Sequence, residues 1–101
     1  MENLPDSQIK VQHRLDGKKG AFFVEHNGER LAEMTYSKMN DQLIIIDHTE
    51  VSDRLRGKGV GKTMVLQAVD MAREQNTKIL PLCPFAKSVF DKVAEIRDVL
   101  K

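Results

Sequence analysis

The chain has 101 residues, of which 41% are hydrophobic and 31% are charged. Its 16 lysines and arginines nearly balance its 15 aspartates and glutamates, which argues against a general surface for nucleic acid or membrane. A chain of this size buries one modest core, so we expect a single domain over residues 1–101.

The first half of the sequence predicts an antiparallel meander. Apolar and polar residues alternate over four segments, as they do in half-buried strands. The predicted strands are residues 8–15, 21–26, 30–39 and 43–51. Turn-forming residues separate them, namely Asp-Gly-Lys-Lys-Gly at 16–20, Asn-Gly at 27–28 and Asn-Asp at 40–41. The Leu-Ile-Ile-Ile run at 43–46 favours a central strand that is covered on both faces.

The second half predicts two helices around one further strand. Residues 60–75 have polar positions at helical spacing and predict a long amphipathic helix. Residues 78–82 predict a short strand parallel to the fourth, because a crossover helix separates the two. Pro84 fits the first turn of a final helix, and we expect the charged tail 95–101 to be frayed. The fold class is therefore α+β, with a mostly antiparallel sheet.

A glycine-rich run, Arg-Gly-Lys-Gly-Val-Gly-Lys-Thr at 56–63, lies between the fourth strand and the long helix. Glycines at every second position let the backbone turn several N–H groups toward one point, and the helix adds its positive N-terminal end. The sequence therefore predicts a phosphate-binding loop. Its local positive charge suits a ligand with several phosphates; the basic residues are Arg54, Arg56, Lys58 and Lys62.

Two common nucleotide-binding motifs do not fit this loop. The P-loop pattern G-x-x-x-x-G-K-[ST] is met at residues 61–63, but Arg56 stands where its first glycine is required. The dinucleotide pattern G-x-G-x-x-G fails in every register, because the glycines fall at 57, 59 and 61. A P-loop nucleotide-binding domain stays open as a third hypothesis, which stronger binding of ATP than of coenzyme A would revive.

The pattern [QR]-x-x-G-x-[GA] is filled by Arg56, Gly59 and Gly61, and here the sequence resembles the GNAT superfamily of acetyl-CoA-dependent N-acetyltransferases. The longer string at 51–62, the segment Ile-Asp-His-Thr-Glu-Val at 46–51 and Cys-Pro-Phe at 83–85 resemble the small, single-domain N-acetyltransferase-like proteins of about a hundred residues. This resemblance spans residues 20 to 92.

The resemblance implies a minimal GNAT-like fold in which the fourth and fifth strands splay apart at their carboxyl ends. The pantetheine arm of acetyl-CoA then enters the gap like an added strand, and a backbone N–H near Val51 polarises the thioester carbonyl. The implied cofactor-binding residues are Val51, Arg56, Gly57, Lys58, Gly59, Val60, Gly61, Lys62 and Thr63.

His48 is the candidate general base or base relay. Imidazole is the side chain that ordinarily titrates near neutral pH, and by alternation His48 shares a face with Glu50, opposite Asp47 and Thr49. A histidine that only forms a hydrogen bond at a strand end is an equal alternative. We expect Asp47 to be a structural hydrogen-bond acceptor.

Cys83 is the second candidate catalytic residue, because it lies across the predicted gap from Val51. It could donate a proton to the departing thiolate or accept the acetyl group as a nucleophile, and the alternative is a small buried apolar residue. Tyr36 is the only tyrosine, and many larger relatives have an acidic tyrosine near the last helix where this chain has Phe85 and Phe90. Neither phenylalanine can donate a proton.

These features lead to two main functional hypotheses. The first is an N-acetyltransferase that transfers acetyl from acetyl-CoA directly to a primary amine; the second is a non-catalytic acyl-CoA-binding or regulatory module of the same fold. The acceptor, a small molecule or a protein or peptide amine, stays open, as does the choice between monomer and homodimer. One cysteine and three scattered histidines predict no metal site. No signal-peptide core or membrane-spanning run is present, so we expect a cytoplasmic protein without a membrane or nucleic-acid partner.

Overall fold

The computed structural model describes residues 4–101 and confirms the α+β class. Its five-stranded sheet has the order β1-β2-β3-β4-β5, so neighbours in the sheet are neighbours in the sequence. The first three pairings are antiparallel, and the pairing of β4 with β5 is parallel. The strands are β1 (Gln12–Asp16), β2 (Lys19–His26), β3 (Glu29–Asn40), β4 (Leu43–Val51) and β5 (Lys78–Pro81). The helices are α1 (Val60–Gln75) and α2 (Pro84–Lys92), with 3-10 turns η1 (Asp6–Gln8), η2 (Asp53–Leu55) and η3 (Ala94–Val99).

The hairpin turns form where the sequence predicts them. Asn27 and Gly28 have φ values of 51° and 81°, the pair of left-handed conformations that a tight hairpin between twisted strands requires. Gly17 (φ 64°) supplies the same conformation between β1 and β2. Only Gly17 and Lys18 are needed for that turn, so β2 begins at Lys19, two residues before the predicted start.

The first predicted strand, 8–15, begins too early. Residues 6–8 form η1, in which the Gln8 N–H donates to the Pro5 carbonyl at 2.9 Å. Pairing with β2 starts only at Gln12. Ile9 and Val11 pack against the core before that point. The alternation therefore indicates which side chains are buried, but it does not indicate where hydrogen bonding between β1 and β2 begins.

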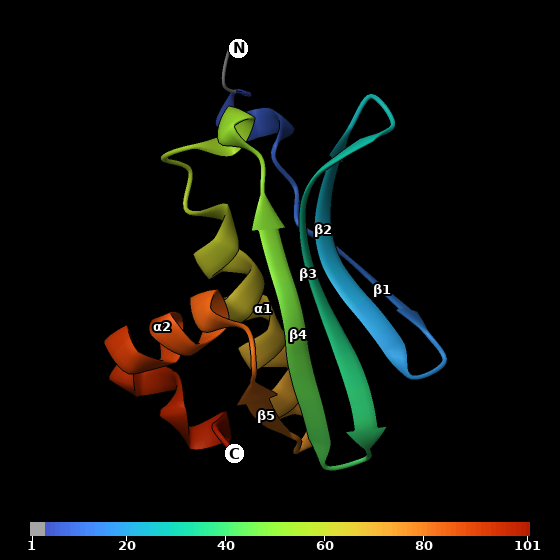
Figure 1. Ribbon diagram of the computed structural model, residues 1–101, viewed down its shortest axis with the longest axis vertical. Coiled ribbons are helices and arrows are strands. Elements are labelled where there is room, and N and C mark those ends of the chain that lie inside the picture. The colour runs from blue at the N-terminus through green and yellow to red at the C-terminus, as the bar shows by residue number, and fades with distance from the viewer. Residues whose placement is uncertain (1–3) are drawn as a thin grey trace.

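The helix α1 connects β4 to β5 and packs against one face of the sheet. Ile44 and Ile46 on that face are 1% and 0% exposed, whereas Leu43 and Ile45 on the other face stay partly exposed. The expectation that both faces of β4 are covered was therefore wrong. Figure 1 shows α1 crossing behind β4, with α2 alongside the β4–β5 end of the sheet.

The carboxyl-terminal segment is packed, which overturns the expectation of a frayed tail. Ile96 and Val99 of η3 are buried, and the Lys101 N–H donates to the Ile79 carbonyl of β5 at 2.8 Å. On the surface, the Arg73 guanidinium of α1 bonds the Asp98 carboxylate at 2.7 Å and holds the pKa of Asp98 below its ordinary value. Two apolar side chains three residues apart thus anchor a segment whose charge predicted exposure.

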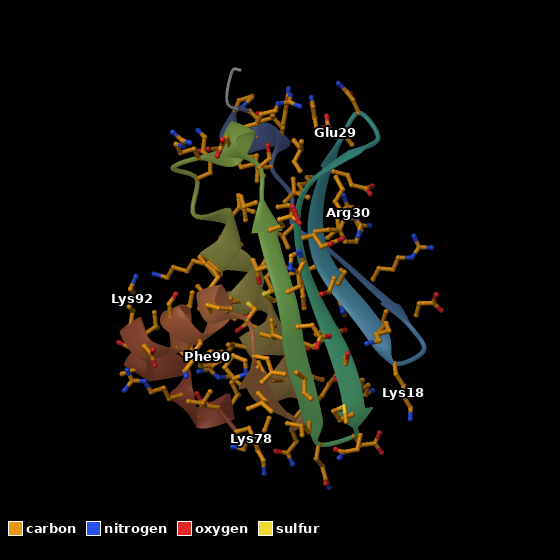
Figure 2. The ribbon with its side chains drawn as sticks, in the orientation of Figure 1. Lys18, Glu29, Arg30, Lys78, Phe90 and Lys92 are labelled. Carbon is orange, nitrogen blue, oxygen red and sulfur yellow. The ribbon has the colours of Figure 1, made fainter. Side chains whose placement is uncertain are left out.

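Different segments of the chain lie at the two ends of the molecule. At one end, η1, η2 and the loop before α1 lie close together (Figure 1), and Glu29 and Arg30 of the β2–β3 hairpin lie at this same end (Figure 2). Lys18 and Lys78 lie at the opposite end (Figure 2). The glycine-rich loop and the carboxyl end of β4 therefore share one end of the molecule.

Candidate functional site

The strand β4 contains a bulge at Asp47. Ile46 pairs with Tyr36, but the next pair along the two strands is His48 with Thr35, so Asp47 is an extra residue on β4. The Asp47 Oδ2 accepts a hydrogen bond from the Ser37 hydroxyl at 2.7 Å, as expected of a structural acceptor. Since Ser37 and Thr35 share the face away from α1, the bulge directs Asp47 and His48 to that same open face.

The expectation that Asp47 lies opposite His48 was therefore wrong. Strict alternation along a strand assumes that each residue has one partner, and a bulge breaks that assumption. Beyond the bulge the alternation resumes, so Thr49 pairs with buried Met34 on the helix side.

The pairing between β4 and β5 ends where the bulge begins. The last pair is Ile46 with Pro81. The N–H groups of Leu82 and Cys83 both donate to the Ile46 carbonyl, at 3.0 and 3.3 Å, and the chain then turns into α2. Residues 47–51 of β4 therefore continue with β3 alone as their partner among residues 4–101. This confirms the predicted splay of the parallel pair.

The free edge of β4 presents backbone donors. The Ser52 N–H donates across to the Leu31 carbonyl of β3 at 2.7 Å. Because successive residues of an antiparallel strand point their backbone groups alternately toward and away from one neighbour, the N–H groups of Val51 and Thr49 point to the vacated side. An extended ligand with amide groups can pair with this edge.

Exposed apolar side chains border the same gap. Val51 at the end of β4 is 38% exposed, Leu82 after β5 is 60% exposed and Phe85 in the first turn of α2 is 41% exposed. Exposed apolar surface of this kind often marks a binding groove. The gap thus combines backbone polar groups with aliphatic and aromatic walls.

The loop before α1 has the backbone shape that the glycines predicted. Gly57 (φ 77°) and Gly59 (φ 67°) are both left-handed, and a Cβ at either position would meet no atom within 4 Å. Gly59 is the N-cap of α1, and its carbonyl accepts from the Thr63 N–H at 2.9 Å. The three N–H groups before Thr63 in α1 have no partner within a helix by geometry, so they are available to an anion.

Gly61 has a different role from the two glycines before it. A Cβ built there would lie 2.5 Å from the Phe85 ring, so this glycine lets α2 pack against the first turn of α1. The regular spacing of the three glycines gives no sign of this division.

Three of the four basic side chains around the loop form ion pairs with carboxylates. The ion pairs are Arg54 with Glu29 at 3.3 Å, Arg56 with Asp53 at 3.2 Å and Lys58 with Asp6 at 3.0 Å. A polyanionic ligand that binds at this loop would replace these carboxylates as the partner of the three cations.

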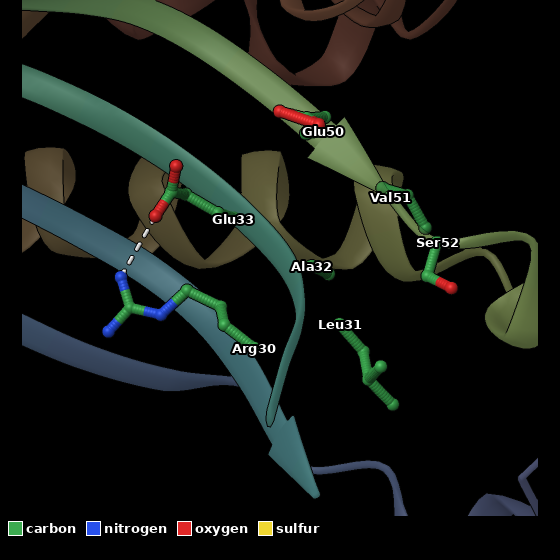
Figure 3. A pocket seen from close by; sticks show the side chains of 7 residues that line it. All are labelled: Arg30, Leu31, Ala32, Glu33, Glu50, Val51 and Ser52. Carbon is green, nitrogen blue, oxygen red and sulfur yellow. Dashed lines mark hydrogen bonds and ion pairs between the residues drawn. The ribbon is translucent and has the colours of Figure 1, made fainter. Parts of the chain in front are cut away.

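His48 lies on the open face beside the end of β4. Its Nε2 is 3.0 Å from the Glu50 Oε2, and the two side chains are 52% and 77% exposed. The expected shared face of His48 and Glu50 is therefore confirmed. A hollow of about 270 Å³ adjoins Glu50 (Figure 3); its lining is Arg30, Leu31, Ala32, Glu33, Glu50, Val51 and Ser52.

Cys83 lies on the other side of β4 and is only 6% exposed. It is the N-cap of α2, not the end of β5, and its Sγ accepts from the Ala86 N–H at 3.3 Å. The Thr49 hydroxyl is 3.1 Å from the same Sγ. The structure therefore brings Cys83 to Thr49, a residue to which the sequence assigned no catalytic role, and places His48 on the opposite face.

The only tyrosine is buried and forms a cluster with His13 and Gly20 that is separate from the gap. Tyr36 is 1% exposed, its hydroxyl is 2.5 Å from the His13 Nε2, and its ring lies against Gly20. Burial raises the pKa of Tyr36 and lowers the pKa of His13. This cluster ties β1 to β3 and is distinct from the gap.

Residues 4–101 contain neither a cluster of metal ligands nor a membrane-spanning helix. No group of three or more histidine, cysteine, aspartate or glutamate side chains in this part of the chain could hold a metal ion. No helix in it is long and apolar enough to cross a membrane.

Comparisons with known proteins give a consistent result. Residues 21–99 match the family described as GCN5-related N-acetyl-transferase. Protein NATD1 of Xenopus tropicalis is 34% identical over 80 residues, covering 78% of this chain and 72% of that protein. The human Protein NATD1 is 32% identical over 76 residues, covering 74% of this chain and 66% of that protein.

Solved structures share the fold. A GCN5-like protein from Staphylococcus aureus, solved by NMR, has a TM-score of 0.70 and 38% identity over 94% of this chain and 90% of that one. Tetrahymena GCN5 has a TM-score of 0.61 at 16% identity, over 76% of this chain and 51% of that one; this second likeness shows the fold alone.

Proposed function

Because the chain belongs to the GCN5-related N-acetyltransferase family, we propose that it binds acetyl-CoA and transfers the acetyl group directly to a primary amine. The observation that carries the proposal is that the free edge of β4 and the glycine-rich loop lie at the same end of the molecule (Figure 1). One ligand with an amide-rich arm and a pyrophosphate fits both.

The loop and the gap bind different parts of the cofactor. The N–H groups at the start of α1, with the positive end of the helix dipole, hold the pyrophosphate, and Arg56, Lys58 and Lys62 add positive charge. The pantetheine arm pairs with the free edge of β4 between Leu82 and Phe85.

When bound, acetyl-CoA supplies an activated thioester, from which an attacking amine displaces the coenzyme thiolate. The Val51 N–H, directed to the free edge, stabilises negative charge on the carbonyl oxygen; one such donor is worth about 2.7–4 kcal/mol in acyl-transfer enzymes. His48 accepts the proton of the amine from the open face, and Glu50 orients its imidazole.

Cys83 lies on the face of β4 opposite to His48, where it can act on the leaving group. Its thiol can donate a proton to the leaving sulfur, and the Ala86 N–H and Thr49 hydroxyl then stabilise the negative charge left on Sγ. The opposite placement of His48 and Cys83 suits direct transfer, because the base then acts on the attacking amine while the acid acts on the departing sulfur, and the two do not compete for one position.

The second candidate is a non-catalytic acyl-CoA-binding module. The observation that favours it is Phe85, which stands in the first turn of α2 and cannot donate a proton. Cofactor binding without turnover on any amine would support this candidate.

Calorimetric titration with acetyl-CoA, and separately with ATP, tests the proposal. Gly59→Trp should abolish acetyl-CoA binding, because a side chain at this left-handed position fills the cradle. Gly17→Trp is the matched control, since it has φ 64° and equally open space at the opposite end of the molecule, and it should bind normally.

Turnover is then measured as thiol release with a panel of amines. His48→Ala and Cys83→Ala should each lower kcat by about 10²–10⁴-fold with little change in acetyl-CoA affinity. Failure of the folded wild-type chain to bind acetyl-CoA would overturn the proposal, and tighter binding of ATP would favour a P-loop type of site.

A further inference from the structure

The two edges of the sheet differ in how they are covered. At the β5 edge the carboxyl-terminal segment lies beside the strand, where Leu100 bridges to Ile79 and the Lys101 N–H donates to the Ile79 carbonyl at 2.8 Å. At the other edge, β2 is the only strand that pairs with β1 within residues 4–101. Figure 1 shows β1 along the outer margin of the sheet. The β1 edge is therefore open to another strand.

The open edge lacks the features that ordinarily prevent strand pairing. Residues 12–16 contain no proline, and their register with β2 is continuous, without a bulge. All five side chains are exposed, and Leu15 among them is 46% exposed. An edge strand with an exposed apolar side chain and free backbone groups is a template for a further strand.

The turn between β1 and β2 determines which backbone groups of β1 face outward. Asp16 pairs with Lys19 across a two-residue turn, and the residues that flank such a turn exchange hydrogen bonds with each other. Because backbone groups alternate in direction along a strand, the N–H and C=O groups of His13 and Leu15 point to the open edge. Val11, directly before β1, continues this outward row.

A second copy of the chain can pair with this edge in a register that matches its charges. With a twofold axis at His13, Lys10 of one copy lies opposite Asp16 of the other, and symmetry forms this pair twice. Both side chains are exposed. Val11, which packs against the core, lies opposite Leu15 of the other copy and gives the exposed leucine an apolar partner.

The neighbouring registers are less favourable. An axis at Arg14 sets two arginines directly opposite each other, and an axis at Gln12 sets Lys10 opposite Arg14. An axis at Leu15 leaves one hydrogen-bonded pair before each strand ends in its turn. An axis at His13 sets two imidazoles opposite each other, but burial lowers the pKa of this side chain, so both are uncharged at neutral pH.

We propose that the chain forms a twofold homodimer through antiparallel pairing of β1 with β1 of a second copy, with the axis at His13. The two sheets become one continuous sheet. Exchanged backbone hydrogen bonds supply the contact, and the pairs of Lys10 with Asp16 set its register. Such a dimer does not depend on acetyl-CoA, because β2, β3 and β4 separate β1 from the gap.

A charge swap tests the register. Sedimentation equilibrium over a concentration series gives the dissociation constant of the dimer. Lys10→Asp or Asp16→Lys alone should raise this constant about tenfold, because each creates two pairs of like charges. The double variant Lys10→Asp/Asp16→Lys should return it close to the wild-type value, since opposite charges again face each other. Asp91→Lys, an equal charge reversal at an exposed position of α2, is the control and should leave it unchanged.

A proline tests the backbone contact. Leu15→Pro removes an N–H that points to the open edge and none that bonds β2, so the variant should be monomeric at every concentration. Thermal unfolding verifies that each variant is folded. The charge swap stays decisive if the proline unfolds the hairpin.

A folded wild-type chain that is monomeric throughout the series would overturn the proposal and leave the edge to a strand of a different protein. A dimer that neither charge reversal weakens would also overturn it, because the contact would then lie on another surface. Failure of the double variant to restore the dimer would do the same, since the register would be a different one.

Discussion

The two halves of β4 differ in pairing and in burial although they form one continuous strand. Residues 43–46 pair with β3 on one side and with β5 on the other, and Ile44 and Ile46 are almost completely buried. Among residues 4–101, β3 is the only strand that pairs with residues 47–51, which begin with a bulge and expose His48, Glu50 and Val51. The first half builds the core, and the second half builds the candidate site.

The difference shows how a small fold makes a site without added structure. Ending one pairing four residues into β5 leaves backbone N–H groups available on β4, and the turn into α2 brings Cys83 beside Thr49. Four variants test whether the two halves are independent.

The largest expected effect is loss of stability in the first half. Ile46→Ala should lower the free energy of unfolding by about 2–5 kcal/mol, because it leaves a cavity at a side chain that is 0% exposed. Val51→Ala in the second half should cost about 1 kcal/mol or less, since Val51 is 38% exposed. Urea unfolding measures both, and equal losses would contradict the division of β4.

The next effect concerns the backbone donor of the second half. Val51→Pro should lower turnover by about 10²–10³-fold, because it removes the N–H assigned to the carbonyl oxygen, while the ladder with β3 loses no bond there. Ser52→Pro is the matched control: its φ of −63° already fits proline, and it removes the bond to Leu31 instead.

Ser52→Pro should therefore reduce stability more than turnover, and Val51→Pro the reverse. Unfolding curves and acetylation rates measured on the same samples give the effect of each variant on stability and on turnover. Equal turnover in the two variants would remove the Val51 N–H from the mechanism.

A smaller effect should distinguish Gly61 from its neighbours. Gly61→Ala should destabilise the fold by about 1–3 kcal/mol, because its Cβ would meet the Phe85 ring. The double variant with Phe85→Ala should recover part of this loss, as a double-mutant cycle would show. Gly57→Ala should affect acetyl-CoA binding more than packing, since its Cβ would meet nothing within 4 Å. Additive losses in the cycle would argue against the contact.

The smallest effect is a pH dependence of stability that arises at the contact between His13 of β1 and Tyr36 of β3, outside both halves of β4. Burial holds the pKa of His13 below its ordinary 6.5 in the folded state, so the unfolded chain binds the proton more readily. Stability should be unaffected by His13 above pH 6.5 and should fall as the pH drops below that value. Burial also raises the pKa of Tyr36, so stability should fall as the pH rises above 10.

Stability curves of wild type and His13→Phe from pH 5 to 8 verify the acidic limb; the variant should show a shallower dependence. A matching slope in the two proteins would place the titration elsewhere. Acetyl-CoA affinity should not follow this titration, because the His13 cluster is distinct from the gap.

Local sequence signals predicted the fold better than they predicted the site. The bounds of β4 and α1 agree with the prediction, since a long apolar run and sixteen residues of helical periodicity leave few alternatives. The start of β1 and the packing of η3 were missed, because both depend on tertiary partners of residues such as Ile9 and Ile96.

For the site, the glycine-rich loop was predictable because positive φ values demand glycine at 57 and 59. The bulge at Asp47 was not, since nothing in the local pattern marks an extra residue. The contact between Thr49 and Cys83 joins residues 34 positions apart, and only the tertiary fold reveals it.

The chain-order arrangement of the sheet has a consequence for folding. Three hairpins connect β1 to β4 through neighbouring residues, and local contacts of this kind form early at little entropic cost. The parallel docking of β5 must wait for the α1 crossover to close. We therefore expect the free edge of β4, the loop and Cys83 to come together only when α1 and β5 dock, so a ligand that contacts all three should bind the folded chain and stabilise it against unfolding.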